Sequence, residues 1–255
     1  MKISVVIQTL NSGNVLRACL ESVKNFDEIV VCDMYSRDDT LEIAKAYGCK
    51  IVMHELCNGI VEPARNFAVR SASHEWVFVV DSDEVVTESL KDYLYAFIKS
   101  ENPSAGLLVP RKNYFMNKFI RASFPDYQLR FFRKERFVLW PETIHSRPEI
   151  AGEVKRIPPR KELAFIHLDE NRISNLILKL NKYSDRELGK RNFNKANGFY
   201  LISKPLFHFF QLYLFKKGFL DGKEGFIYAC LIGFYKYLII AKMIERKKQL
   251  LSGKK

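Results

Sequence analysis

Hydrophobic and polar positions follow one another along the first fifty residues in an order that predicts strands and helices in turn. Three short apolar runs rich in β-branched residues predict buried strands: 3–7, 28–32 and 50–53. Apolar positions at helical spacing predict one helix over 13–24, and capping residues before position 40 predict a second that ends at Tyr47. This alternation indicates a doubly wound α/β sheet.

The next strand is the one around which the remaining chain is organised. Residues 76–80 read as a buried strand, and they are followed at once by Asp81, Asp83 and Glu84. Ligands of open α/β sheets sit beyond the carboxyl ends of the strands, and an Asp-x-Asp pair there suits a hard divalent cation that also binds phosphate. The same residues are ordinary turn formers, so the pattern alone leaves a solvated turn open.

From residue 111 the pattern changes to interleaved aromatic and basic residues. Residues 107–110, 128–132 and 163–166 are predicted strands, and the last of them ends at His167. Arg130 and Arg133 are expected either to hold a phosphate of a bound partner or to pair with surface acids.

Three helices are predicted for the last third of the chain, over 172–190, 200–217 and 224–246. The last two are apolar, rich in Phe and Tyr, and bordered by lysines and arginines. Neither matches the roughly 20 apolar residues of a membrane span, whereas both suit helices lying in an anionic membrane interface. A helical pair packed on the catalytic part is the alternative.

Charge is distributed unevenly over the 255 residues, which carry a formal net charge of +12. Residues 1–110 hold 10 Lys and Arg against 16 Asp and Glu, and residues 111–255 hold 31 against 13. The second part is therefore suited to an anionic partner such as nucleic acid, acidic lipid or a phosphorylated glycan.

The five cysteines show no Cys-x-x-Cys spacing, which favours reduced thiols and a cytoplasmic protein. The first residues lead directly into a strand, so no signal peptide is expected.

Polar residues also end the first two strands, with Thr9 and Asn11 after one and Asp33 after the other. These ends can converge with Asp81 and Asp83 on one crevice, which suits a nucleotide whose diphosphate is held by a metal. No Gly-x-Gly-x-x-Gly motif follows the first strand, which argues against a dinucleotide cofactor.

Several segments in the same order resemble the inverting family 2 glycosyltransferases of the GT-A fold. The segments are Val5–Thr9, Asp27–Asp33, Asp38–Lys45, Ala64–Ala68 and Val80–Glu84. Two more segments, Pro125–Arg133 and Gly218–Gly222, are similar to the subgroup that contains lipopolysaccharide core β-1,4-glucosyltransferases. The resemblance implies a GT-A, or nucleotide-diphospho-sugar transferase, fold: a doubly wound mixed sheet with a C-terminal helical extension.

The resemblance also implies a role for each matching residue. Thr9, Asn11 and Asp33 would border the base and ribose of a UDP-sugar. Arg65 would help to neutralise the diphosphate, and Asp81 and Asp83 would bind ribose and a Mg²⁺ or Mn²⁺ ion, the DXD motif of the family.

Inversion needs one base that takes the proton of the acceptor hydroxyl. Asp126 matches the family position for this base, and Glu142 is the second candidate. The subgroup often has Val-His-Glu where this chain has Ile144, His145 and Ser146. This departure leaves open whether His145 joins the metal ligands.

The sequence thus predicts a catalytic domain over 1–195, with a nucleotide-sugar half (1–110) and an acceptor half (111–195). A basic, apolar helical extension over 196–255 would associate with the membrane. The expected enzyme moves a hexose, such as glucose from UDP-glucose, to a lipopolysaccharide-core or lipid-linked glycan at the inner face of the plasma membrane, as a peripheral protein. A polyprenyl-phosphate glycosyltransferase is the alternative. A nucleic-acid-binding protein is a more distant alternative, because acids in the crevice would repel a phosphate backbone. No nucleic acid partner is therefore expected.

Overall fold

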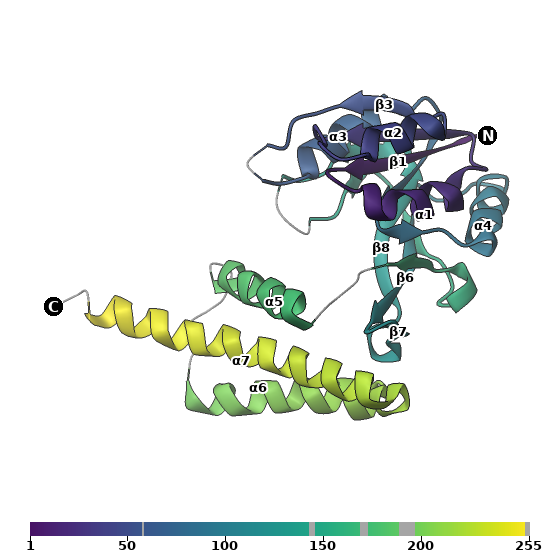
Figure 1. Cartoon of the computed structure of the whole chain (residues 1–255). Helices are drawn as coiled ribbons and strands as arrows, with labels where there is room; N and C mark the ends of the chain where they lie inside the picture. The colour runs from purple at the N-terminus through teal and green to yellow at the C-terminus, as the bar shows by residue number, and fades with distance from the viewer. Residues whose placement is uncertain (58, 143–145, 169–172, 189–196, 253–255) are drawn as a thin grey trace. The chain divides into compact units, whose positions relative to one another are not determined.

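Figure 1 shows a computed structural model of the chain. The structure describes residues 1–57, 59–142, 146–168, 173–188 and 197–252. The chain divides into two compact units: residues 1–112 with 125–168, and residues 113–124 with 169–255. The first unit carries the strand-end acids and the second carries the C-terminal helices. The functional division predicted at residue 195 stays a prediction.

A parallel sheet forms the core of the first unit. β1 (Ile3–Thr9), β2 (Glu28–Asp33), β3 (Lys50–Met53) and β4 (Trp76–Asp81) run parallel in the order β3-β2-β1-β4. Every residue of β1 is buried, as a central strand with helices on both faces requires. All four predicted strands are present, and β1 continues two residues past the predicted run.

Antiparallel strands extend the sheet beyond β4 and make it mixed. β8 (Asp126–Arg133) lies between β4 and β6 (Gly106–Phe115) and is antiparallel to both. The order continues through β12 (Phe165–His167) to β5 (Glu84–Val85). The predicted doubly wound mixed sheet is thus confirmed.

Shorter elements complete this unit. β11 (Val154–Arg156) pairs with β6, and β9 (Phe137–Leu139) forms a separate two-stranded sheet with β10 (Glu149–Ile150). The predicted strand 163–166 starts later, because residues 161–163 form a 3₁₀ turn before β12.

Helices cover both faces of the parallel strands (Figure 1). α1 (Gly13–Val23), α2 (Thr40–Ala46) and α4 (Glu88–Ile98) share one apolar cluster with one face, and α3 (Glu62–Ser71) packs on the other. The helix predicted to begin after capping acids is α2. Its cap residue Asp39 makes no capping bond through its side chain. Asp38 instead accepts the Thr40 N–H at 3.2 Å and the Gly13 N–H at 3.0 Å, and so links α2 to α1.

The second unit is mainly helical. α5 (Ile173–Leu188), α6 (Gly198–Phe210) and α7 (Gly222–Ser252) follow in the chain, and a π-helical turn (η5, Gln211–Phe215) and a 3₁₀ turn (η6, Gly218–Asp221) connect the last two. Residues 113–124, with the short strand β7 (Lys118–Phe119), add Phe115, Ile120 and Ala122 to an apolar cluster with these helices. The predicted helices are therefore present, with α7 longer than predicted.

One segment in the described part of the chain, Gly218–Leu250, is long and apolar enough to cross a membrane by length and composition, and one 18-residue window within it has a mean hydropathy of 1.6. Only 28% of that window is buried. The sequence indicated that neither helix matches a membrane span, whereas α7 passes this test of length and composition; its place in an anionic membrane interface stays a prediction. Length alone does not decide whether it crosses a membrane.

A close backbone approach joins η6 to the start of α7. A Cβ atom on Gly225 would lie 2.0 Å from the carbonyl oxygen of Gly218, whereas one on Gly198 would meet nothing within 4 Å. We expect Gly225→Ala to destabilise the helical unit by about 1–3 kcal/mol, as overpacking does. Gly198→Ala is the matched control and should be neutral or slightly stabilising. Urea unfolding followed by circular dichroism measures both, and equal midpoints would contradict the packing.

Candidate functional site

The carboxyl ends of β1, β2 and β4 lie side by side and bring predicted residues to one edge of the sheet. Thr9 stands opposite Asp33, and Gln8 opposite both Cys32 and Asp81, in the parallel register. The register therefore places Thr9, Asp33 and Asp81 at the same edge, where ligands of open α/β sheets bind.

Asp33 is a fully buried carboxylate held by neutral donors. The Thr9 hydroxyl donates to Oδ2 at 2.9 Å, and Ser36 donates its N–H to Oδ1 at 2.8 Å and its hydroxyl to Oδ2 at 2.6 Å. The N–H of Asn11 donates to Ser36 Oγ at 2.8 Å, and the Asn11 side-chain oxygen accepts the Arg37 N–H at 2.8 Å. These bonds join the loops after β1 and β2 and fix the direction of the carboxylate.

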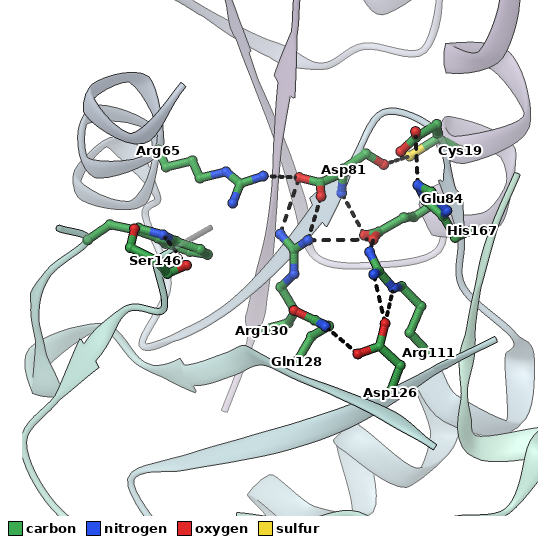
Figure 2. A network of polar contacts seen from close by, with 12 residues as sticks. Cys19, Arg65, Asp81, Glu84, Arg111, Asp126, Gln128, Arg130, Ser146 and His167 are labelled. Carbon is green, nitrogen blue, oxygen red and sulfur yellow. Dashed lines mark hydrogen bonds and ion pairs between the residues drawn. The ribbon is translucent and has the colours of Figure 1, made fainter. Parts of the chain in front are cut away.

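Asp81, at the end of β4, lies between two arginines (Figure 2). Arg65 from α3 donates to Oδ1 at 2.6 Å. Arg130 from β8 approaches the same oxygen at 3.2 Å and also bonds Oδ2. Burial raises the pKa of Asp81, but the charges of Arg130 and Arg65 outweigh it and hold the pKa well below its usual range. Asp81 is therefore an anion whose two oxygens are both engaged by guanidinium groups.

Glu84 is buried beside this pair. Its Oε2 accepts the Asp81 N–H at 2.9 Å, and its Oε1 lies 3.5 Å from Arg130 and 3.6 Å from Arg111. Burial raises the pKa of Glu84, with the negative charge of Asp81 adding to it, and the two arginines offset only part of the shift. Glu84 therefore has two structural roles. It closes the turn after β4 through the Asp81 N–H, and it pairs with Arg130 and Arg111.

Asp126, the predicted base, belongs to the same network. It stands opposite Arg111 in the antiparallel pairing of β8 with β6. Arg111 donates to Oδ2 through Nε at 3.0 Å and through Nη2 at 2.7 Å, and Gln128 donates to Oδ1 at 2.8 Å. Because Arg111 also faces Glu84, charged contacts connect Asp126 with Asp81, as Figure 2 shows.

The two arginines of the basic stretch differ in surroundings. Arg130 is 4% exposed and pairs with the buried acids of the network. Arg133 lies 5.1 Å above the Trp76 ring and pairs with Glu75 and Glu135. Of the two alternatives for these residues, the structure shows pairing with acids.

The second acid of the Asp-x-Asp motif has a different partner. His167 Nε2 lies 3.2 Å from Asp83 Oδ2, because β12 pairs with β5 and sets His167 opposite Glu84. Burial lowers the pKa of His167, but the hydrogen bond and charge of Asp83 outweigh it and raise the pKa above its ordinary value. Of the two partly exposed side chains, the carboxylate is of the ligand type that Mg²⁺ and Mn²⁺ prefer.

The structure gives less support to a metal site and to the other two predicted residues, Glu142 and His145. Among the residues the structure describes, no group of three or more His, Cys, Asp or Glu side chains is arranged for a metal. Glu142 is exposed, and no hydrogen bond or ion pair among the described residues joins it to the network. His145 lies outside the described residues.

Trp140 is a site residue that the sequence did not reveal. Arg65 lies 4.7 Å and Arg130 5.9 Å from the centre of its ring. The Asn66 side chain makes two hydrogen bonds to the backbone of Trp140. Its amide nitrogen donates to the Trp140 carbonyl at 2.9 Å, and its amide oxygen accepts the Trp140 N–H at 2.7 Å. Trp140 therefore supports the two arginines that hold Asp81. The only signal for it was the Ala64–Ala68 segment, whose Arg and Asn both contact it.

Comparison with known proteins agrees with this geometry. Residues 4–151 match the profile of Glycosyl transferase family 2. The chain belongs to this family. It is therefore a glycosyltransferase, and the resemblance inferred from its motifs is confirmed.

Two curated relatives cover almost the whole chain. The lipopolysaccharide core biosynthesis glycosyltransferase LpsC of Rhizobium meliloti is 29% identical over 258 residues, which are 96% of this chain and 93% of LpsC. The uncharacterized glycosyltransferase RC0292 of Rickettsia conorii is 26% identical over 96% of this chain and 90% of its own length.

The fold has a solved counterpart in residues 1–349 of S. aureus TarS. The two structures agree with a TM-score of 0.52 over 98% of this chain and 92% of that one, at 20% sequence identity. The mixed sheet of this glycosyltransferase is thus a GT-A fold.

The buried network generates a stability prediction. Arg130→Met leaves Asp81 and Glu84 with one buried cation fewer, so we expect a loss of roughly 3 kcal/mol in the free energy of unfolding. Arg136→Met is the control, since Arg136 is half exposed and pairs, among the described residues, with exposed Glu135, and it should cost less than about 0.5 kcal/mol. Urea titration at pH 7 compares them. Similar losses in both variants would show that the network is not stabilising.

The Asp83–His167 pair generates a pH prediction. Since Asp83 raises the pKa of His167, the pair stabilises the fold below about pH 6.5 and loses this contribution as the pH rises through the folded-state pKa. Asp83→Asn should therefore lower the urea midpoint at pH 5.5 and change it less at pH 9. A loss of the same size at both pH values would contradict the ion pair.

Proposed function

We propose that this glycosyltransferase moves a hexose, with inversion, from a UDP-sugar to a glycan of the lipopolysaccharide core or to a lipid-linked glycan. One observation carries the proposal: charged contacts join the donor-side acid Asp81 to the base candidate Asp126 within one site. The lipopolysaccharide core relative LpsC supports the class of acceptor.

The donor nucleotide would bind across the ends of β1 and β2. Thr9 and Asp33 end β1 and β2, and Asn11 lies in the loop after β1; hydrogen bonds hold the loops after the two strands together, which presents a rigid rim to a base and ribose. Asp33 is buried and fixed by three hydrogen bonds, so it holds in place the two chain segments that would border the base and ribose.

Negative charge grows on the departing diphosphate, and cations near it lower the barrier. Asp81 and the Trp140 ring both contact the Arg65 guanidinium, so these contacts orient it before a substrate binds. Asp83 and His167 would hold a Mg²⁺ or Mn²⁺ ion, which supplies Lewis-acid stabilisation to the diphosphate when bound. Asp81 stays paired with its arginines in this arrangement and would meet the ribose, and His145 remains a candidate ligand.

Asp126 would take the proton of the acceptor hydroxyl. Arg111 and Gln128 hold its two oxygens and fix the direction of the carboxylate. We expect Asp126→Asn to lower transfer by at least about 100-fold while UDP affinity changes little. Glu142→Gln is the matched control and tests the second candidate.

Radiolabelled transfer and calorimetric UDP binding measure these two effects separately. Wild-type transfer by Asp126→Asn would remove it as the base. A large loss by Glu142→Gln alone would move the role to Glu142.

Donor and metal are tested together by thermal shift. A sugar nucleotide that binds the folded state raises its melting temperature by mass action. We expect UDP-sugars to do so with Mn²⁺ or Mg²⁺, and Asp83→Ala to lose the metal-dependent part of the shift. If a UDP-sugar raises the melting temperature of the wild type equally with and without metal, the proposed metal cofactor is wrong.

We also propose that the enzyme acts in the cytoplasm, bound peripherally to the anionic inner face of the plasma membrane. α6 and the turns after it expose large apolar residues, among them Phe199 at 73%, Ile202 at 66% and Phe215 at 80%. Lys204, beside Tyr200 and Phe207, and the lysines at 216 and 217 border this surface. Apolar side chains edged by lysine suit an anionic lipid interface.

Surface variants test the membrane contact without touching the core. Ile202→Asp with Phe215→Asp should reduce co-sedimentation with phosphatidylglycerol vesicles by about tenfold or more. Val138→Asp, at a half-exposed apolar position of β9, is the control. Vesicle binding unchanged in the double variant would disprove the contact.

Salt and carbonate washes decide between the two acceptor classes. Release from membranes supports a peripheral enzyme. Retention through both washes supports firm insertion of α7 and the alternative acceptor, a polyprenyl phosphate.

A nucleic-acid partner has little support in the geometry. Arg111 and Arg130, within the basic aromatic stretch that suggested one, are engaged by Asp126, Glu84 and Asp81. Tight, salt-sensitive gel shifts with RNA or DNA, together with no UDP-sugar binding, would support that alternative.

A further inference from the structure

Tyr35, in the loop after β2, has a backbone conformation that aromatic residues seldom adopt. Its φ is 61°, in the left-handed region, which is unfavourable for an L-residue other than glycine. Its side chain is 57% exposed, and the described structure gives it no hydrogen bond, ion pair or ring contact. The fold therefore gains little from this side chain to offset its backbone strain.

The strain comes from bonds on both sides of the residue. The N–H of Met34 donates to the Thr9 carbonyl at 2.9 Å, and the Met34 side chain is buried. Ser36 binds Asp33 through both its N–H and its hydroxyl. The bonds that fix Asp33 thus force residue 35 into the left-handed region, whatever its side chain.

Glycine or asparagine would satisfy the same backbone at lower cost. Asn11 does this in the neighbouring loop, with a φ of 50°. A tyrosine at position 35 therefore needs a reason outside the packing of the protein. The loop presents its ring rigidly and open to solvent, two residues from the buried Asp33.

We propose that Tyr35 is the stacking platform for the base of the donor nucleotide. This inference rests on the proposed function, which places the nucleotide across the ends of β1 and β2. Stacking buries the exposed ring against a flat base, and it tolerates any base because each has a π-face. Tyr35 then supplies affinity, and it does so for any base.

The test compares stability with two ligands in the full chain. Tyr35→Gly relieves the strained backbone, so we expect a higher melting temperature together with roughly tenfold weaker UDP binding. Manganese pyrophosphate, which has no base, should bind the variant and the wild type equally. Tyr35→Phe keeps the ring and should keep UDP affinity.

Met116→Gly is the matched control, because Met116 is also exposed and has a φ of 51°, in the turn between β6 and β7. It should raise the melting temperature without changing UDP affinity.

Three results would overturn the proposal. If Tyr35→Gly binds UDP as tightly as the wild type, the ring does not stack. If pyrophosphate binding falls as much as UDP binding, residue 35 acts by shaping the loop. If the wild type binds no nucleoside diphosphate with or without metal, the proposed donor itself is wrong, and this outcome is distinct from the other two.

Discussion

The end of β4 is built on compensation between buried charges. Arg65, Arg111 and Arg130 interleave with Asp81, Glu84 and Asp126, so each carboxylate has a guanidinium partner. Taking charges out of water is costly, and removing one member leaves another uncompensated. This requirement ties β4, β6, β8 and α3 together at the sheet edge where we propose that the substrates bind.

The same compensation divides the Asp-x-Asp motif into two environments. Both oxygens of Asp81 are occupied by arginines, whereas Asp83 is partly exposed beside His167. A metal ion would have to displace a guanidinium group to bind Asp81. To bind His167 it would have to displace only the proton on the imidazole. The proposed metal site therefore lies at the more exposed acid, and Asp81 serves to orient Arg65 and Arg130.

Local pattern was enough to predict much of this arrangement. Periodicity and strand-end acids located β1, β2 and β4 and placed Thr9, Asp33 and Asp81 together, because parallel strands end at one edge. The long C-terminal helices also followed from their spacing, although their ends did not. Asp126 came only from the family resemblance, since a single acid before a strand is not distinctive.

The arginine partners were harder to predict because they depend on non-local pairing. Arg111 meets Asp126 only through the register of β6 with β8. The alternation of β8 was a usable signal, because Asp126, Gln128 and Arg130 share one face of the strand. His167 was noticed at its strand end, but nothing local paired it with Asp83, which requires β12 to meet β5. Trp140 lies in a loop whose position no periodicity determines.

The most direct measurement is a crystal structure with UDP and Mn²⁺, in which anomalous scattering locates the manganese. The account predicts one manganese peak bound by Asp83 and His167, with Arg130 still paired to Asp81 and the uracil beside the loops after β1 and β2. Manganese bound to Asp81 with Arg130 displaced, or a nucleotide away from those loops, would contradict it.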